Sequence, residues 1–154
     1  MKKLLLLIIT WAAAMLALPG VAQTSASPMV SSAATSDALY KVFGEKPGLF
    51  KLVEDFHIRL LADPRTGPHF KPVNAKNIKE QLTNQFCNVT GGPCEYKGAD
   101  MKSAHSNLDI TKSDFNALVE VLQASMDAQG VGFSAQRQLL ARLAPMHRDV
   151  ITVK

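Results

Sequence analysis

Four histidines and two cysteines are the residues of this 154-residue chain best able to carry chemistry. The histidines, His57, His69, His105 and His147, are widely separated, and none shares a zinc-like spacing with a cysteine or another histidine. The chain contains no glycine-rich phosphate loop, no H-E-x-x-H motif and no G-x-S-x-G motif. A lone histidine is more often a packed or surface residue than a metal ligand, so local motifs alone define no reaction.

The segment before His105 is built to turn. Gly91, Gly92, Pro93 and Gly98 precede this histidine within fourteen residues. Glycine permits backbone angles that other residues resist, and proline fixes one dihedral and removes a hydrogen-bond donor. The pattern predicts an irregular loop that ends at an imidazole, which makes His105 the histidine to examine as a metal ligand.

The two cysteines, Cys87 and Cys94, flank the double glycine. In an oxidising compartment such a pair usually forms a disulfide, which is the favoured interpretation, and two unpaired cysteines packed as small hydrophobes are the alternative. The chain has no C-x-x-C-H motif, so covalent c-type haem attachment is not indicated. A thiol enzyme is the weaker interpretation, since each cysteine has the other as its expected partner.

The N-terminus has the pattern of a secretory signal peptide. A short basic start precedes an apolar run over residues 4–18 and a small-residue segment at 19–22, which predicts a signal peptide over 1–22. The apolar run is shorter than a membrane span, so a retained anchor is the weaker alternative. Residues 23–35 are small and polar and are expected to form a disordered tether, with the folded domain at 36–154. We therefore expect an exported protein, periplasmic or secreted, with no stable membrane insertion after cleavage.

The charge of the chain does not indicate a nucleic-acid partner. Seventeen basic and 13 acidic residues give a formal net charge of +4, of which Lys2 and Lys3 of the expected signal supply two. No block of basic residues and no alternation of basic and aromatic residues occurs. The expected domain is of ordinary size for one hydrophobic core and too short for two.

The apolar residues recur with helical spacing, and no stretch alternates at period two, so the sequence predicts an all-α fold. A short helix is expected after Asp37, and longer helices are expected from about Pro47, Asn74, Thr111 and Ser134. Thr111 with Asp114 has the pattern of a helix start. Pro145 is expected to bend or interrupt the last helix. The expected stripes include Leu49, Leu52, Val53, Phe56, Leu60, Leu118, Leu122, Met126, Leu139 and Leu143.

From Leu39 to Val150 the chain resembles a group I truncated haemoglobin. The resemblance is carried by LYKVFG, LVEDFHIRLLADPR, HF, CNVTGGPCEYKGADMKSAH and LAPMHRDV, in this order and nearly without gaps. It covers essentially the whole expected domain. It implies a two-over-two helical sandwich around a b-type haem, with a mostly irregular segment before the short proximal helix.

The resemblance also implies roles for single residues. His105 corresponds to the proximal ligand of the haem iron, whose other ring nitrogen requires an acceptor that fixes its orientation. Lys79 and Lys102, with Tyr96, are candidates for contacts with the haem propionates, although solvation at the surface explains the lysines equally well. The residues expected to contact the haem are Phe70, Ile78, Leu82, Phe86, Tyr96, Met101 and Phe115, each of which could instead be ordinary core.

The distal side departs from the commonest family pattern. His57 stands where most members have a tyrosine, and Ile78 and Leu82 stand where a glutamine is often found. His57 is then the chief polar group beside the bound ligand, with Gln81 as a second if it turns inward. A hydrogen bond from His57 to the ligand is favoured over direct ligation of the iron. His69 and His147 are assigned to structure or surface.

The resemblance implies reversible binding of a diatomic ligand, dioxygen first, with nitric oxide or carbon monoxide as further ligands. Such a protein would bind or transport oxygen. A second hypothesis is a nitric oxide dioxygenase or peroxidase-like activity, which would need an external reductase because the sequence contains no reductase domain. A third is a helical binding module without haem, because every apolar stripe could be core.

Overall fold

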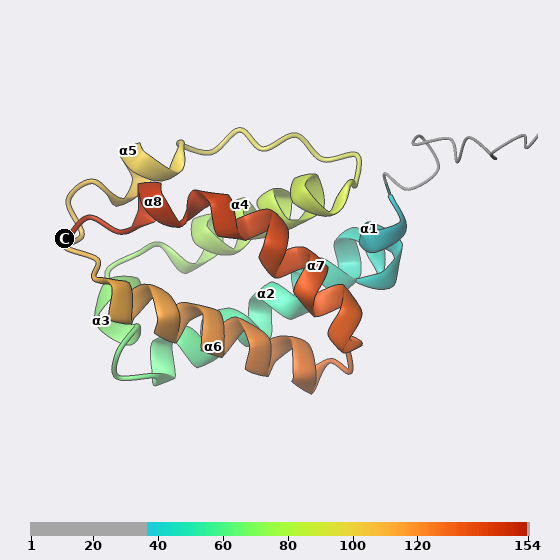
Figure 1. Ribbon diagram of the computed structural model, residues 1–154, viewed down its shortest axis with the longest axis horizontal. Coiled ribbons are helices and arrows are strands. Elements are labelled where there is room, and N and C mark those ends of the chain that lie inside the picture. Colours follow the sequence, from blue (N-terminus) through green and yellow to red (C-terminus); the bar gives the residue numbers. More distant parts are fainter. Residues whose placement is uncertain (1–36, 154) are drawn as a thin grey trace, which may run out of the picture. The chain divides into compact units, whose positions relative to one another are not determined.

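The computed structural model describes residues 37–153, which form helices and contain no β-strand. The predicted all-α fold is therefore confirmed for this part of the chain. The expected signal peptide (1–22) and tether (23–35) lie outside the described residues. No helix within 37–153 combines the length and the apolar character needed to cross a membrane. The helices are α1 (Ala38–Val42), α2 (Glu45–Ala62), α3 (Gly67–Phe70), α4 (Ala75–Thr90), α5 (Met101–His105), α6 (Lys112–Ala128), α7 (Phe133–Leu143) and α8 (His147–Val150), with a short 3-10 turn, η1 (Ala144–Met146), before α8 (Figure 1).

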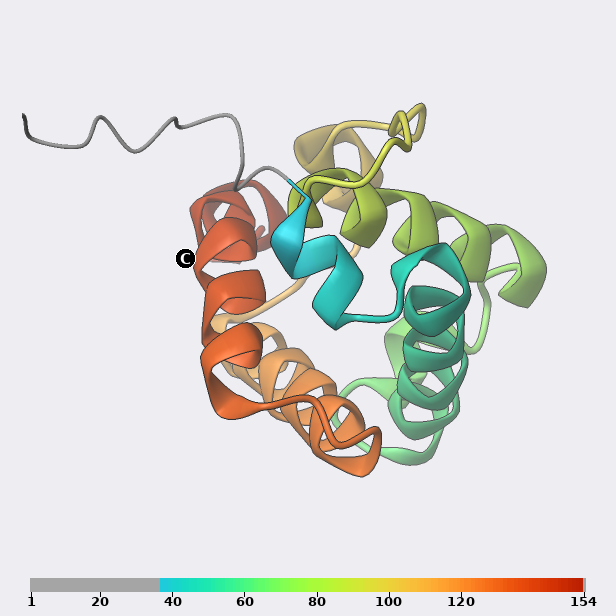
Figure 2. The same ribbon diagram turned by 90° about the vertical axis from the view of Figure 1, so that its right-hand side faces the viewer.

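The long helices form two pairs. Helix α2 packs against α4 and α6, and α7 packs against α4 and α6. Figure 2 shows α2 and α4 on one side of the domain and α6 and α7 on the other. The short helix α5 packs against α8 at one end of this arrangement. The two-over-two helical sandwich is thus present in the folded part of the chain.

Helix α2 supplies much of the core. Its apolar residues recur at spacings of three and four, which places them on one face of a 3.6-residue helix. The five residues of this face are each at most 2% exposed in the structure, and burial of such a side chain contributes about 1.5–3 kcal/mol relative to exposure. The buried residues of this face are Leu49, Leu52, Val53, Phe56 and Leu60.

The helix starts follow local hydrogen bonding. Thr111 and Asp114 form a reciprocal capping box at the start of α6, and Asn74 accepts a hydrogen bond from the backbone N–H of Asn77 at the start of α4. Asp37 stands before α1 but makes no side-chain cap. The interruption expected at Pro145 appears as η1, which separates α7 from α8.

Three details differ from the expectation. Helix α2 begins at Glu45 rather than near Pro47, and α7 begins at Phe133 rather than Ser134. The link between α2 and α4 contains one helical turn, α3, which was not among the expected helices and has Pro68 in its first positions. Proline is favoured there because its fixed φ suits the first turn and its missing N–H has no intrahelical partner.

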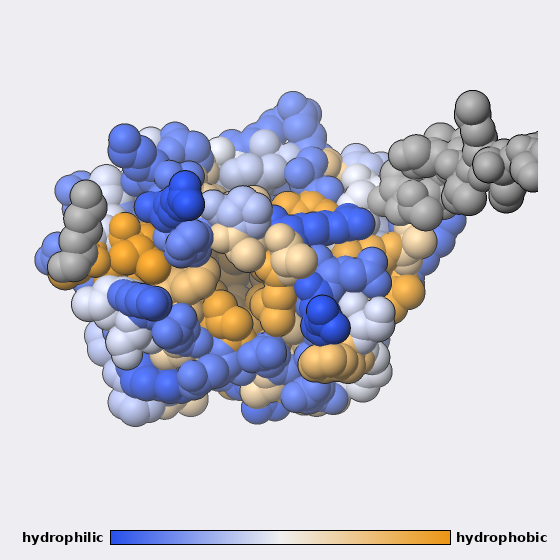
Figure 3. Space-filling model, viewed as in Figure 1, coloured by the Kyte–Doolittle hydropathy of each residue, from blue (hydrophilic) through white to orange (hydrophobic). Residues whose placement is uncertain are grey.

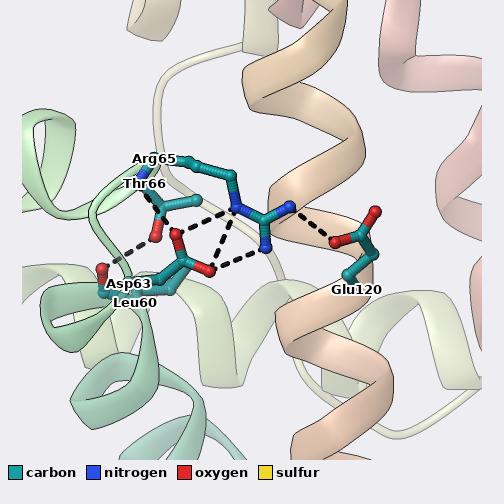
Figure 4. Close-up of polar contacts among 5 residues, drawn as sticks. All are labelled: Leu60, Asp63, Arg65, Thr66 and Glu120. Atoms are coloured by element: carbon teal, nitrogen blue, oxygen red, sulfur yellow. Dashed lines mark hydrogen bonds and ion pairs between the residues drawn. The ribbon is translucent and has the colours of Figure 1, made fainter.

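An ion-pair network fixes the link between α2 and α3 to α6 (Figure 4). The Arg65 guanidinium donates to both carboxylate oxygens of Asp63, with Nη2 2.8 Å from Oδ2, and its Nη1 lies 2.7 Å from Oε2 of Glu120. Beside it, the buried Thr66 hydroxyl donates to the carbonyl of Leu60 at 2.8 Å. Hydrogen bonds from Arg65 lower the pKa of Asp63 from 3.8 to about 2.

The lowered pKa of Asp63 predicts an acid-dependent contribution to stability. Because the folded-state pKa lies below the unfolded one, this contribution is present above pH 3.8 and is lost as the pH falls towards about 2. We expect Asp63→Asn to lower the urea midpoint near neutral pH and to approach the wild type as the pH falls below about 2. Glu120→Gln keeps the contacts between Asp63 and Arg65. Its urea midpoint should therefore change with pH as steeply as that of the wild type over the same pH range. A constant difference between Asp63→Asn and wild type across this pH range would contradict the assignment.

Candidate cofactor site

An apolar cavity of about 260 Å³ lies between α2, α4, α5, α6 and the C-terminal helices. Figure 3 shows it as a hollow near the middle of the face of Figure 1, surrounded by hydrophobic residues. The structure places all of the expected haem contacts on its wall together with His105 and Gln81. Those expected contacts are Phe70, Ile78, Leu82, Phe86, Tyr96, Met101 and Phe115.

His105 ends the short helix α5 and lines the cavity. The helix is started by Asp100, whose carboxylate accepts from the backbone N–H of Ser103 at 2.9 Å. The His105 Nδ1 atom lies 2.7 Å from the backbone carbonyl oxygen of Met101. A carbonyl can only accept, so this contact requires the proton on Nδ1 and leaves the lone pair on Nε2. Nε2 is therefore the ring nitrogen able to bind a metal.

The loop before α5 is fastened to α4. Gly91 caps α4 in a left-handed conformation with φ of 88°, which glycine adopts without strain. Cys87 and Cys94 are joined in a disulfide with their Cα atoms 5.7 Å apart. By the chain-entropy model, closure of so short a loop contributes about 2–3 kcal/mol. The disulfide thus ties the segment that leads to His105 to the last turn of α4.

Farther along, the same loop closes against the cavity wall. Tyr96 donates a hydrogen bond from its hydroxyl to the carbonyl of Ala99 at 2.8 Å, and burial raises the pKa of Tyr96, with the Asp100 charge adding to the effect. A Cβ at Gly98 would lie 2.4 Å from the Tyr96 hydroxyl and 2.7 Å from Oε1 of Gln81. A larger residue at this position would have to displace the ends of the Tyr96 and Gln81 side chains, so Gly98 lets the loop lie close to α4 without moving them.

His57 is buried, with 5% of its surface exposed, but it is not part of the cavity wall. Its neighbour Phe56 lines the cavity. The Nε2 atom of His57 is buried without a hydrogen-bond partner within residues 37–153. Burial lowers the pKa of His57, and the positive charge of Lys79 lowers it further. The ring is therefore neutral near pH 7, and one of its nitrogens is left for an incoming group.

The lysines considered for propionate contacts do not line the cavity. Lys79 instead donates to Oε1 of Glu54 at 3.2 Å and lies 5.8 Å from the centre of the Phe50 ring. Lys102 is exposed on α5. Consecutive residues on a helix point about 100° apart, so Ile78 lines the cavity while Lys79 does not.

Two polar residues that the sequence did not single out for the site belong to the cavity wall. His69 and Asp114 both line it, with His69 Nε2 3.8 Å from Asp114 Oδ2. Asp114 also accepts from the Thr111 backbone and hydroxyl, which lowers its pKa. The sequence offered one signal for His69, which stands directly before Phe70, an expected haem contact. Its partner Asp114 lies 45 positions away on another helix, so sequence spacing could not indicate the pair. His147, in contrast, is exposed and does not line the cavity. Among residues 37–153, no three His, Cys, Asp or Glu side chains are grouped to hold a metal ion.

The comparisons with known proteins agree with this geometry. Residues 38–152 match the sequence family of bacterial-like globins. A group 1 truncated haemoglobin of Mycolicibacterium paratuberculosis is 30% identical over 115 residues, which cover 75% of this chain and 85% of the relative. A group 1 truncated haemoglobin of Tetrahymena thermophila is 30% identical over 93 residues, which cover 60% of this chain and 77% of the relative. The chain therefore belongs to the group 1 truncated haemoglobins.

Solved structures show the same architecture. The truncated haemoglobin of Tetrahymena pyriformis in its Fe(III) form is 26% identical, with a TM-score of 0.71 over 73% of this chain and 97% of that one. The 2/2 haemoglobin of Synechococcus, solved in the cyanomet state with covalently attached haem, is 23% identical and has a TM-score of 0.69 over 73% and 97% of the two chains. The latter likeness concerns the fold alone. Membership of this family implies a haem that binds diatomic ligands.

The residues of the cavity fit such a group. Its wall is largely apolar and aromatic, as required by a flat macrocycle that leaves water. Of the two histidines on this wall, His105 has its Nδ1 on the Met101 carbonyl and keeps its Nε2 free of that contact. The unpaired Nε2 of His57 belongs to a buried residue next to the cavity-lining Phe56. Polar groups for a partly exposed edge are present in Tyr96, His69 and Gln81.

Proposed function

We propose that the chain binds a b-type haem through Nε2 of His105 and holds dioxygen reversibly at its iron. The main support for this proposal is the contact between His105 Nδ1 and the Met101 carbonyl, which fixes the tautomer that leaves Nε2 available as a ligand. His105 also lines an apolar cavity. When bound, the haem supplies the iron at which a diatomic ligand is held. Phe70, Phe86 and Phe115 would pack against the group and exclude water from it.

His57 is proposed to stabilise the ligand by a hydrogen bond from its neutral ring. A buried polar atom without a partner costs about 1–3 kcal/mol, and the Nε2 atom of His57 is such an atom. A ligand that accepts from it would remove part of this cost. Phe56 and not His57 lines the cavity, so either role requires the imidazole to reach towards it. The hydrogen bond is the favoured role, because a bound ligand shortens the distance that the ring would have to span. Gln81 is proposed as a second polar contact from the wall.

The proposed ligation by His105 can be tested by spectroscopy. Wild type purified with haem, or reconstituted with haemin, should show a Soret band and the ferrous spectrum of a histidine-ligated haem. His105→Gly should lose this spectrum, and added imidazole should restore it because it supplies the missing nitrogen. His147→Ala, a change of an exposed histidine that does not itself line the cavity, serves as the control. An unchanged ferrous spectrum in His105→Gly would exclude His105 as the ligand.

The role of His57 predicts opposite effects on stability and on ligand retention. His57→Leu removes the unpaired buried nitrogen, so the free energy of unfolding without ligand should not fall by more than the small packing difference. Dioxygen dissociation should become roughly ten-fold faster, since a hydrogen bond in a dry pocket contributes about 1–2 kcal/mol. Stopped-flow measurement of dissociation and urea unfolding provide the two readouts. An unchanged dissociation rate would contradict the hydrogen bond, and conversion of a six-coordinate resting spectrum to a five-coordinate one would indicate ligation instead.

We further propose that the protein is exported. The pattern over residues 1–22 supports this, and the disulfide between Cys87 and Cys94 suits an oxidising compartment. In a bacterial host, the exported fraction should begin at Gln23 by N-terminal sequencing. Leu7→Arg, which interrupts the apolar run, should leave the full-length chain inside the cell. Recovery of an exported protein that still begins at Met1 would contradict cleavage, and retention of the wild type inside would contradict export.

A further inference from the structure

Gln85 is a buried polar side chain that the ligand chemistry does not use. It is 8% exposed on α4, directly before the cavity-lining Phe86. Its side-chain Nε2 lies 3.5 Å from the sulfur of Met101 and 3.5 Å from the sulfur of Met146. One amide group therefore connects three elements: α4, the start of α5 and the turn η1.

The two sulfur contacts of Gln85 orient the methionine side chains more than they stabilise the fold. A thioether sulfur is a weak acceptor, so two such contacts compensate poorly for removing an amide from water. A methionine at position 85 would fill nearly the same volume without that desolvation cost. What only the amide provides is a planar pair of N–H groups that holds two sulfurs at fixed positions.

One of the two sulfurs belongs to the same residue whose backbone carbonyl contacts His105. Met101 is the first residue of α5, and its carbonyl accepts the hydrogen bond from Nδ1 of His105. Helix α5 spans only Met101–His105, and a helix of one turn has little stability of its own. Its orientation must come from outside contacts, and the Gln85 amide is such a contact at its start.

We propose that Gln85 is a positioning residue for the proximal histidine, acting through Met101. The proposal rests on the proposed ligation of iron by His105. By holding the Met101 side chain against α4 and Met146, Gln85 fixes the carbonyl that sets the tautomer and the tilt of the imidazole. Loss of the amide should weaken the hydrogen bond at Nδ1 and make Nε2 a poorer ligand.

The test compares Gln85→Met with wild type in the haem-loaded protein. Removal of the N–H donors should lower the iron–histidine stretching frequency in the resonance Raman spectrum of the ferrous form. It should also speed the loss of haem on the order of ten-fold, the usual scale for a changed partner of a metal-binding histidine. The urea midpoint should stay close to that of wild type, because the volume at this position is conserved. Wild-type values for both the frequency and the haem loss would overturn the proposal.

A second readout does not depend on haem. In the ¹⁵N-labelled chain as purified, the proton on Nδ1 of His105 should exchange with solvent faster in Gln85→Met than in wild type. Met101→Leu should reproduce the effect, and the double variant should add little to it, since both changes remove one contact. If wild type holds no haem, the proposed function fails, and this exchange rate alone then decides whether Gln85 positions the imidazole.

Gln136→Met is the matched control. Gln136 is buried to a similar degree, but its Nε2 donates to Asp127 and to the carbonyl of Val131, far along the sequence from α5. The same substitution there should leave the iron–histidine frequency and the Nδ1 exchange unchanged. An equal change in both variants would show general loosening of the domain and would overturn the specific role of Gln85.

Discussion

The proposed binding of haem in the cavity depends on the hydrogen bond between Nδ1 of His105 and the carbonyl of Met101. It decides which ring nitrogen carries the proton, and so which one can bind iron. The bond lies within a single helical turn, and that turn is held by a cap at Asp100, by a loop fastened through a disulfide and by contacts with α4. The surrounding fold serves chiefly to keep this turn in place.

The loop between α4 and α5 shows how a short connection can act as a rigid support. Left-handed Gly91 turns the chain at the end of α4, the disulfide holds it there, and Gly98 lets it lie against Tyr96 and Gln81. The loop has little regular hydrogen bonding of its own. The left-handed glycine, the disulfide and the close approach at Gly98 hold it in place instead. They also bring two polar side chains to the edge of an otherwise apolar cavity.

The polar groups around the cavity divide into satisfied and unsatisfied ones. Thr66 and Asp114 have partners, and His105 uses one nitrogen. His57 has a buried nitrogen without a partner and a pKa lowered by burial, which keeps it neutral. A structure that leaves one neutral nitrogen unpaired beside an apolar cavity sacrifices some stability at that point, as binding sites commonly do.

Periodicity and capping chemistry determined the long helices from the sequence alone. The stripe of α2, the capping box of Thr111 and Asp114 and the interruption at Pro145 are local, because each depends on residues within a few positions of one another. The family resemblance added the expected cavity residues, and their common location follows from the two-over-two packing. Tertiary structure alone decided that His69 meets Asp114, that Gln85 reaches two methionine sulfurs, and that His57 is buried without lining the cavity. Those relations depend on side-chain direction across helix contacts between distant segments, which sequence spacing does not encode.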